Sequence, residues 1–228
     1  MTEKRTKSIE RLKEKLSNQE LFKEENNKIF VSGIIDSKIE FSHQNGPKTY
    51  FKTKLKVSRL SGVPDYIPIV IPQKVIKNKT WFDEKIIGKQ VEITGKLRSR
   101  RTLREDGKKH IGIFISVDNI NIVDEGTENE NIVYLEGKVS QETILRSTPM
   151  GQKITQVNVK VKKYNGKVYC FPCIAWNNVA LAVNEFNVED EIKFYGRLQS
   201  RVYKKKEEGH EDIYLETYEI SIIKLERN

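Results

Sequence analysis

The chain lacks most features that would place it in a secreted, membrane or metal-dependent class. Its 228 residues include two cysteines and three histidines, too few for a disulfide framework. No run of 18 apolar residues occurs, which excludes a transmembrane helix. The first residues, MTEKRTK, contain no apolar stretch, so we expect no signal peptide. These absences favour a cytoplasmic protein with reduced thiols.

Apolar residues are scarce as well. They make up 37% of the chain, below the share of about 45–50% that is usual in globular proteins. A single core of this length would normally hold more of them. Two small domains have a higher ratio of surface to volume, and they fit this composition better.

The positive charge is concentrated in one part of the chain. The formal net charge is +9. Residues 1–26 carry seven basic and six acidic side chains, residues 27–125 carry 19 and 11, and residues 126–228 carry 15 of each. This asymmetry indicates a polyanionic partner for the middle part. A surface that lysine merely makes soluble is the alternative interpretation.

An internal repeat divides the chain. Gly33 and Gly137 lie 104 residues apart, and GKLRSR at 95–100 matches GRLQSR at 196–201 after a three-residue shortening. A nearly constant offset over this length predicts two copies of one domain. The predicted division is a charged segment at 1–26, a first domain at 27–125, a polar linker, and a second domain at 131–228.

Both copies have the pattern of short strands. KTKLKVS at 52–58 and QVNVKVK at 156–162 alternate apolar with polar residues, as half-buried strands do. Five or so strands and one small helix per copy favour the oligonucleotide/oligosaccharide-binding (OB) barrel. The predicted fold class is therefore mainly β, with two tandem five-stranded OB-fold barrels. Residues 1–26 have apolar residues at near-helical spacing, which predicts either a solvated helix or a docking helix.

Four motifs follow one another in the second copy. They are TPMG at 148–151, IAWNNVA at 174–180, GRLQSRVY at 196–203 and TYEISIIKLE at 217–226. In this order they resemble the bacterial single-stranded DNA-binding protein family. The whole chain is similar to the tandem two-barrel version of that family in low-GC Gram-positive bacteria, the first copy chiefly through the repeat.

The resemblance implies a non-catalytic protein without cofactors that binds single-stranded DNA in replication, recombination or repair, associated with the nucleoid. Replication or repair proteins are the implied protein partners, and a homodimer is the simplest assembly because the family typically presents four barrels. Two departures stand out. No Gly-rich region with an acidic tip follows the last strand, which weakens the case for recruitment through a tail. In addition, Pro72 stands where the repeat would place a counterpart of Trp176.

Binding of single strands without sequence preference needs cations and flat side chains on which bases stack. Strand parity places cations and tyrosines on one face of residues 192–203. Trp176 and Tyr203 match stacking positions of the family, and two tyrosines flank the turn at Asn165-Gly166. The candidate residues of the second copy are Trp176, Tyr203, Arg201, Arg197, Tyr195, Lys193, Tyr164 and Tyr169.

The first copy offers many cations and few rings. Its candidate residues are Lys52, Lys54, Lys56, Lys96, Arg98, Arg100, Arg101 and Arg104. We hypothesise a division of labour in which the first barrel mainly binds phosphates and the second adds stacking. A solvated strand face is the alternative for the three lysines of residues 52–56.

Other chemistry finds little support. CFPC at 170–173 has no second pair and no nearby histidine to complete a metal site, and it lies in a predicted strand rather than at a helix start. Phosphate-binding glycine loops and a nucleophile elbow are missing, so we expect no enzyme. Two alternatives remain: a primosomal or replication accessory protein that acts mainly through protein–protein contacts, and an RNA-binding barrel protein.

Overall fold

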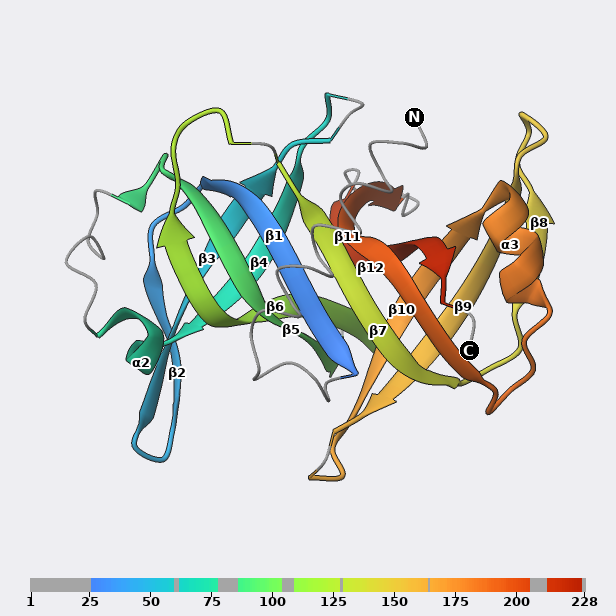
Figure 1. Ribbon diagram of the computed structural model, residues 1–228, viewed down its shortest axis with the longest axis horizontal. Coiled ribbons are helices and arrows are strands. Elements are labelled where there is room, and N and C mark those ends of the chain that lie inside the picture. The colour runs from blue at the N-terminus through green and yellow to red at the C-terminus, as the bar shows by residue number, and fades with distance from the viewer. Residues whose placement is uncertain are drawn as a thin grey trace.

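A computed structural model describes residues 26–59, 62–77, 86–103, 109–127, 129–163, 165–205 and 213–226. Within these ranges the chain is almost entirely β-structure, arranged as two barrels side by side (Figure 1). No helix of the described residues is long and apolar enough to cross a membrane. The predicted helical segment lies outside the described residues, apart from Asn26.

The described residues of the first barrel form six strands and one short helix. They are β1 (Asn27–Ile35), β2 (Glu40–Asn45), β3 (Lys48–Val57), β4 (Asp65–Pro72), α2 (Gln73–Ile76), β5 (Gln90–Leu103) and β6 (Lys109–Ile122). The strand order is β2-β3-β4-β6-β5-β1, and a further β1–β3 pairing closes the barrel. The pairs are antiparallel except for β4 with β6, which are parallel. This is the five-stranded OB barrel, with β2 added as an edge strand.

The second barrel repeats this topology. Its elements are β7 (Asn131–Val139), β8 (Ile144–Ser147), β9 (Lys153–Lys162), β10 (Val168–Trp176), α3 (Asn177–Asn184), β11 (Glu191–Lys205) and β12 (Ile213–Leu225). Here β7 pairs with β9 to close the barrel, and β10 runs parallel to β12. The predicted fold class of two tandem OB barrels is confirmed.

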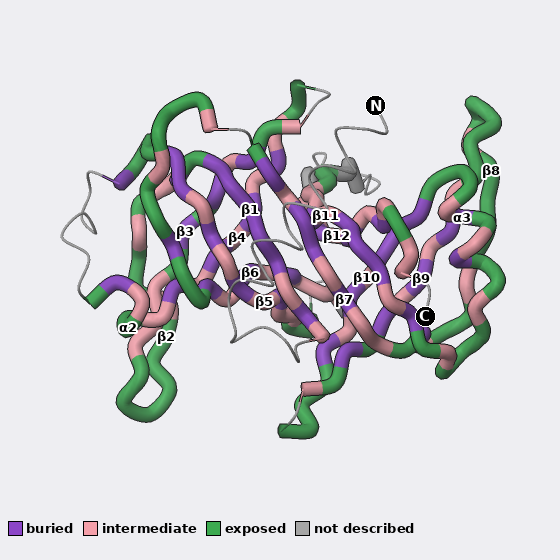
Figure 2. The backbone as a smooth tube through the Cα atoms, in the orientation of Figure 1, coloured by how far each residue is buried: buried purple, intermediate pink, exposed green. Residues whose placement is uncertain are grey.

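Alternating burial explains why these segments form strands. In β3, Leu55 and Val57 point into the core, whereas Lys54 is exposed and Lys56 is half-buried. The corresponding Val159 and Val161 of β9 are buried in the same way. Figure 2 shows the resulting pattern, with buried backbone in the barrel walls and exposed backbone at the hairpin tips.

The repeated glycines lie where the first strand of each barrel closes it. A Cβ on Gly33 would lie 2.5 Å from the carbonyl oxygen of Lys56, and one on Gly137 would collide with the carbonyl oxygen of Lys160. Only glycine leaves room for the two strands to approach at this point. Barrel closure therefore requires glycine at the same position of each copy, which explains why this residue recurs in the repeat.

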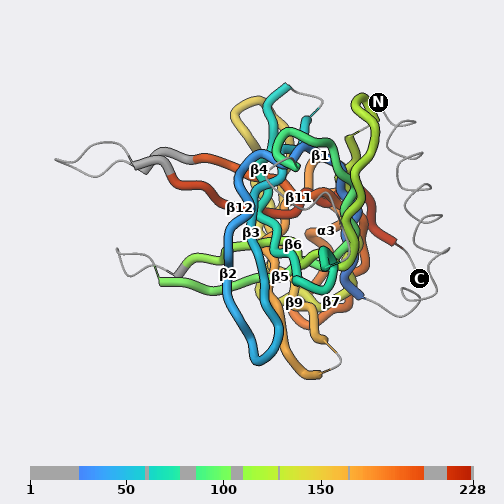
Figure 3. Tube along the Cα trace, turned by 90° about the vertical axis from the view of Figure 1, so that its left-hand side faces the viewer, coloured from blue at the N-terminus to red at the C-terminus, as the bar shows by residue number. Residues whose placement is uncertain are grey.

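The barrels are joined in two ways. First, β1 and β7 pair antiparallel, so one continuous sheet runs through both barrels. Second, the long hairpins β5–β6 and β11–β12 each reach the other barrel: Ser99 Oγ accepts a hydrogen bond from the backbone N–H of Cys170 at 3.1 Å, and Ser200 Oγ accepts one from that of Tyr66 at 3.4 Å. Both hairpins leave the molecule on the same side (Figure 3).

Candidate nucleic-acid interface

The outer face of β3 and β4 carries a row of lysines beside apolar and aromatic side chains. Across the two strands Lys56 faces Tyr66, Lys54 faces Pro68 and Lys52 faces Val70. Lys52 and Lys54 each form an ion pair but keep about half of the side chain exposed. The side chain of Lys52 is 55% exposed and that of Lys54 is 46% exposed, with ion pairs of 3.6 Å to Glu40 and 3.1 Å to Glu216. The parity prediction for these three lysines agrees with their surface positions.

The same face continues onto β5 and β6. Lys96 faces Ser116, Arg98 faces Phe114 and Arg100 faces Gly112. Strand β6 is also the parallel neighbour of β4. One outer surface therefore runs from β3 through β4 and β6 to β5, with cations along both sides and apolar groups between them. Phe114 belongs to this surface, although sequence analysis did not identify it.

The arginines of β5 have different environments. The Arg98 guanidinium lies 4.9 Å from the centre of the Tyr169 ring of the second barrel, in a cation–π contact. Arg100 and Arg101 are exposed on the projecting hairpin. Lys96 is partly exposed, 4.0 Å from the carboxylate of Asp118. The structure thus leaves Arg100 and Arg101 as the most accessible cations of this strand.

In the second barrel, Trp176 ends β10 and is 37% exposed. It faces Ile154 of β9, which in turn faces Arg146 of β8. Asn177 follows with a φ of 52° and turns the chain into α3. The indole therefore lies at the outer face in the same cross-strand row as Arg146, with β9 between them, and this row offers a ring for a base and a cation for a phosphate.

Strand β11 carries a polar ladder toward its hairpin. The Arg197 Nη2 donates a hydrogen bond to Gln199 Oε1 at 3.2 Å, and Gln199 Nε2 donates one to Glu219 Oε1 at 2.8 Å. Arg201, two residues further, is exposed. Arg201 thus occupies a position in the second hairpin like that of Arg100 in the first.

Two predicted stacking residues are corrected by the structure. Tyr195 is 7% exposed and packs against Phe30 and Ile132, and burial raises its pKa to about 12. Tyr169 is 6% exposed, with its ring centroid 6.3 Å from that of Phe171. Neither ring is open to a base in this structure.

The first residues of β11, which include Lys193, lie on a different surface from the residues near its hairpin. Lys193 makes a 3.4 Å ion pair with Glu136 of β7, and the register shifts between Tyr195 and Gly196. The strand first pairs with β7 and only afterwards reaches the first barrel. Of the remaining candidates, Arg104, Tyr164 and the side chain of Tyr203 lie outside the described residues.

A pair of rings in the first barrel was missed from the sequence. His43 of β2 and Tyr50 of β3 face each other, with ring centroids 4.5 Å apart and an angle of 4° between their planes. Tyr50 also faces Pro72 of β4. Extending the alternation of the lysines 52, 54 and 56 by one step toward the N-terminus would have placed Tyr50 on the same face.

The two cysteines lie three residues apart in β10. Both are free thiols, and Cys173 is buried, which raises its pKa well above the usual range. Among the described residues, no group of three His, Cys, Asp or Glu side chains could hold a metal ion.

Comparison with solved structures finds this arrangement elsewhere. The wild-type single-stranded DNA-binding protein from Thermus aquaticus matches with a TM-score of 0.69 and 19% identity, over 89% of this chain and 92% of that chain. A deletion variant of that protein gives the same TM-score and identity, with 94% of its chain covered. The fold is shared. The match extends through both barrels, and at this identity it establishes the fold alone.

A third structure, the N-terminal domain of the PriB protein from Thermoanaerobacter tencongensis, is 29% identical. It covers 44% of this chain and 100% of its own length, with a TM-score of 0.36. No family model matches the chain, and no curated protein sequence matches it.

Proposed function

We propose that this protein binds single-stranded DNA without sequence preference and without catalysis. The observation that carries the proposal is the outer surface of the first barrel, where cations of β3 and β5 border the apolar side chains of β4 and β6. Lysine and arginine along such a surface neutralise phosphates, and apolar or aromatic side chains between them accept the faces of the bases.

The second barrel supplies an exposed ring at the corresponding face. Trp176 stands beside Arg146 across one intervening strand. Stacking on a ring tolerates any base because every base has a π-face. A strand passing from one barrel to the other would meet Arg100 and Arg201 on the two hairpins. The fold shared with the Thermus protein supports this interpretation, as does the resemblance of the second copy to the single-stranded DNA-binding family.

A role in replication, recombination or repair is the biological context that this activity implies, within the tandem two-barrel version of the family. Coating a single strand would suppress hairpins and keep a template accessible. A homodimer with four barrels remains the simplest assembly.

Titration with oligo-dT at low salt tests the proposal. We expect quenching of tryptophan fluorescence in the native protein and a much smaller response in Trp176→Phe, which separates the signal of Trp176 from that of Trp81, the other of the two tryptophans in the sequence. Duplex DNA of the same length should bind far more weakly. If no oligonucleotide binds at low salt, the proposal is wrong. If RNA of matching sequence binds more tightly, RNA is the ligand.

A further inference from the structure

The two barrels carry their aromatic groups on different strands of the same face. The 104-residue offset relates Tyr50 to Ile154 and Pro72 to Trp176. In the first barrel the ring is on β3 and faces a proline, whereas in the second it is on β10 and faces an isoleucine. Each barrel thus has one large ring in the same cross-strand row, displaced by a single strand, a distance of about 4.8 Å.

Tyr50 is not a lone ring. His43 lies parallel to it, and the Nδ1 atom of His43 is 3.0 Å from Ser42 Oγ, which helps to fix the imidazole. His43 is exposed while Tyr50 is half-buried. The pair therefore forms a short stack that is anchored on the barrel by Tyr50 and is accessible from the imidazole side.

A register shift in β2 brings this pair together. Glu40 faces Lys52 and Phe41 faces Phe51, but the pairing then moves by one residue so that His43 faces Tyr50. Without the bulge, His43 would share the side of Phe41 and point away from the lysine row. The irregularity in β2 thus places a flat side chain on the same face as the cations.

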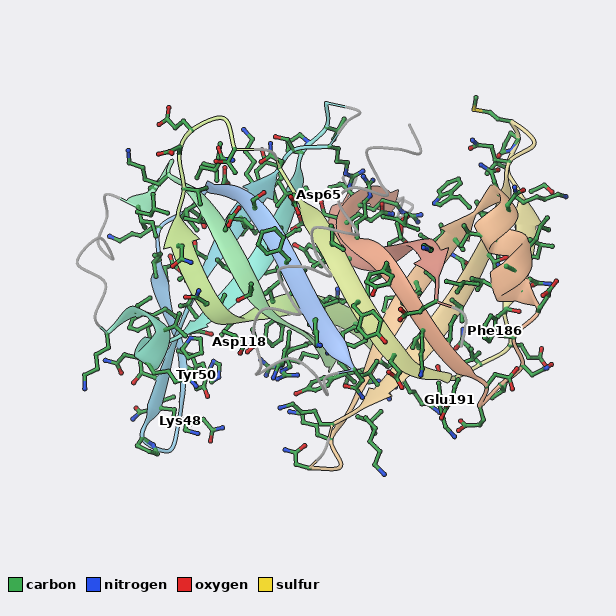
Figure 4. All side chains as sticks on the ribbon, viewed as in Figure 1. Lys48, Tyr50, Asp65, Asp118, Phe186 and Glu191 are labelled. Carbon is green, nitrogen blue, oxygen red and sulfur yellow. The ribbon has the colours of Figure 1, made fainter. Side chains whose placement is uncertain are left out.

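Cations lie on both sides of the stack along β3. Lys52, two residues after Tyr50, is on the same face, and Lys48 begins the strand at the exposed hairpin end. Figure 4 shows Tyr50 and Lys48 following one another along this hairpin. The spacing provides a phosphate contact before and after a base that is stacked at the pair.

We propose that the His43–Tyr50 pair is a base-stacking site of the first barrel, with Lys48 and Lys52 on the flanking phosphates. This inference rests on the proposed function, and it revises the hypothesis in which the first barrel mainly binds phosphates and the second adds stacking. Both barrels then hold bases, through a His–Tyr stack in one and an indole in the other. The ligand at each site is one nucleobase of a continuous single strand.

Alanine variants of the full chain test the site. Truncating one stacking ring costs about 1–3 kcal/mol per base, so His43→Ala should weaken oligo-dT binding by about 5- to 150-fold. His43→Tyr, which keeps a flat ring, should restore most of the affinity. Phe41→Ala is the matched control because Phe41 is 60% exposed on the same strand but faces the other way. It should change affinity less than twofold.

Photo-crosslinking provides an independent readout. An oligonucleotide containing 5-iodouracil should crosslink to His43 or Tyr50 as well as to Trp176. If His43→Ala binds like the native protein while Trp176→Ala is weakened, and no crosslink maps to β2 or β3, the inference is overturned and the proposed function stands. If the native protein binds no oligonucleotide, both are overturned.

Discussion

Asp65 of the first barrel accepts a hydrogen bond from the backbone N–H of Ser200 in the second, with the nitrogen 2.6 Å from Oδ1. The carboxylate is 1% exposed and also accepts a hydrogen bond from Arg59 Nε at 2.8 Å. The hydrogen bond from Arg59 to this carboxylate, together with its negative charge, raises the pKa of the Arg59 guanidinium. One buried carboxylate thus fixes the β11–β12 hairpin against the first barrel (Figure 4), and with it the relative position of the two binding faces.

Replacing Asp65 tests this connection. Asp65→Asn removes the charge that pairs with Arg59, and breaking a buried ion pair costs about 3–5 kcal/mol. Because the Arg59 side chain is 21% exposed, we expect a loss near the lower end, measured by urea denaturation. Glu189→Gln is the control, since its ion pairs with Lys138 and Lys160 are exposed and should contribute less than about 1 kcal/mol. Equal effects of the two variants would contradict the prediction.

The close approach of β1 and β3 at Gly33 leads to a second prediction. Gly33→Ala would place a methyl group 2.5 Å from the carbonyl oxygen of Lys56, and such overpacking costs about 1–3 kcal/mol or more. Gly112→Ala is the matched control in another strand, because its Cβ would meet nothing closer than 3.9 Å. Thermal denaturation should show a clearly lower midpoint for Gly33→Ala only. A midpoint unchanged from the native protein would show that β1 can move away from β3.

Much of the fold is encoded in local patterns. The alternation in residues 52–58 and 156–162, together with the paired glycines, predicted two barrels of short strands. Each of these signals reflects a local requirement: period-2 burial in a strand, or space for one backbone to approach another. For the same reason Lys52, Lys54 and Lys56 could be assigned to the outer face.

The site was less predictable because contacts beyond a single strand decide which of its side chains are exposed. Tyr169 lies in the inward-facing row of β10 with Phe171 and joins the core, and Tyr195 packs in one cluster with Phe30 of the other barrel. Parity along one strand cannot show which neighbour covers a face. The His43–Tyr50 stack was missed for a related reason, since a bulge in β2 sets its register.

The raised pKa of Tyr195 predicts a loss of stability at high pH. Burial raises its pKa from 10.0 to about 12, so the unfolded state loses the phenolic proton first. The stabilisation is complete below pH 10 and falls as the pH rises toward 12. Tyr195→Phe lacks this group, and its free energy of unfolding should fall less between pH 9.5 and 11.5 than that of the native protein. Parallel pH dependences in urea titrations would refute the assignment.

The exposed arginines of β5 should contribute to the salt dependence of binding. Each phosphate contact on a single strand contributes about 0.7 to the slope of log K against log salt concentration. Arg100→Gln with Arg101→Gln should therefore reduce the magnitude of that slope by about 1.4, with little change in tryptophan quenching at saturation. Lys224→Gln is the control, because Lys224 is exposed but faces Tyr195 at the far end of β12 from the hairpin. An unchanged slope in the double variant would place the bound strand away from the β5–β6 hairpin and confine it to the β3–β4 face.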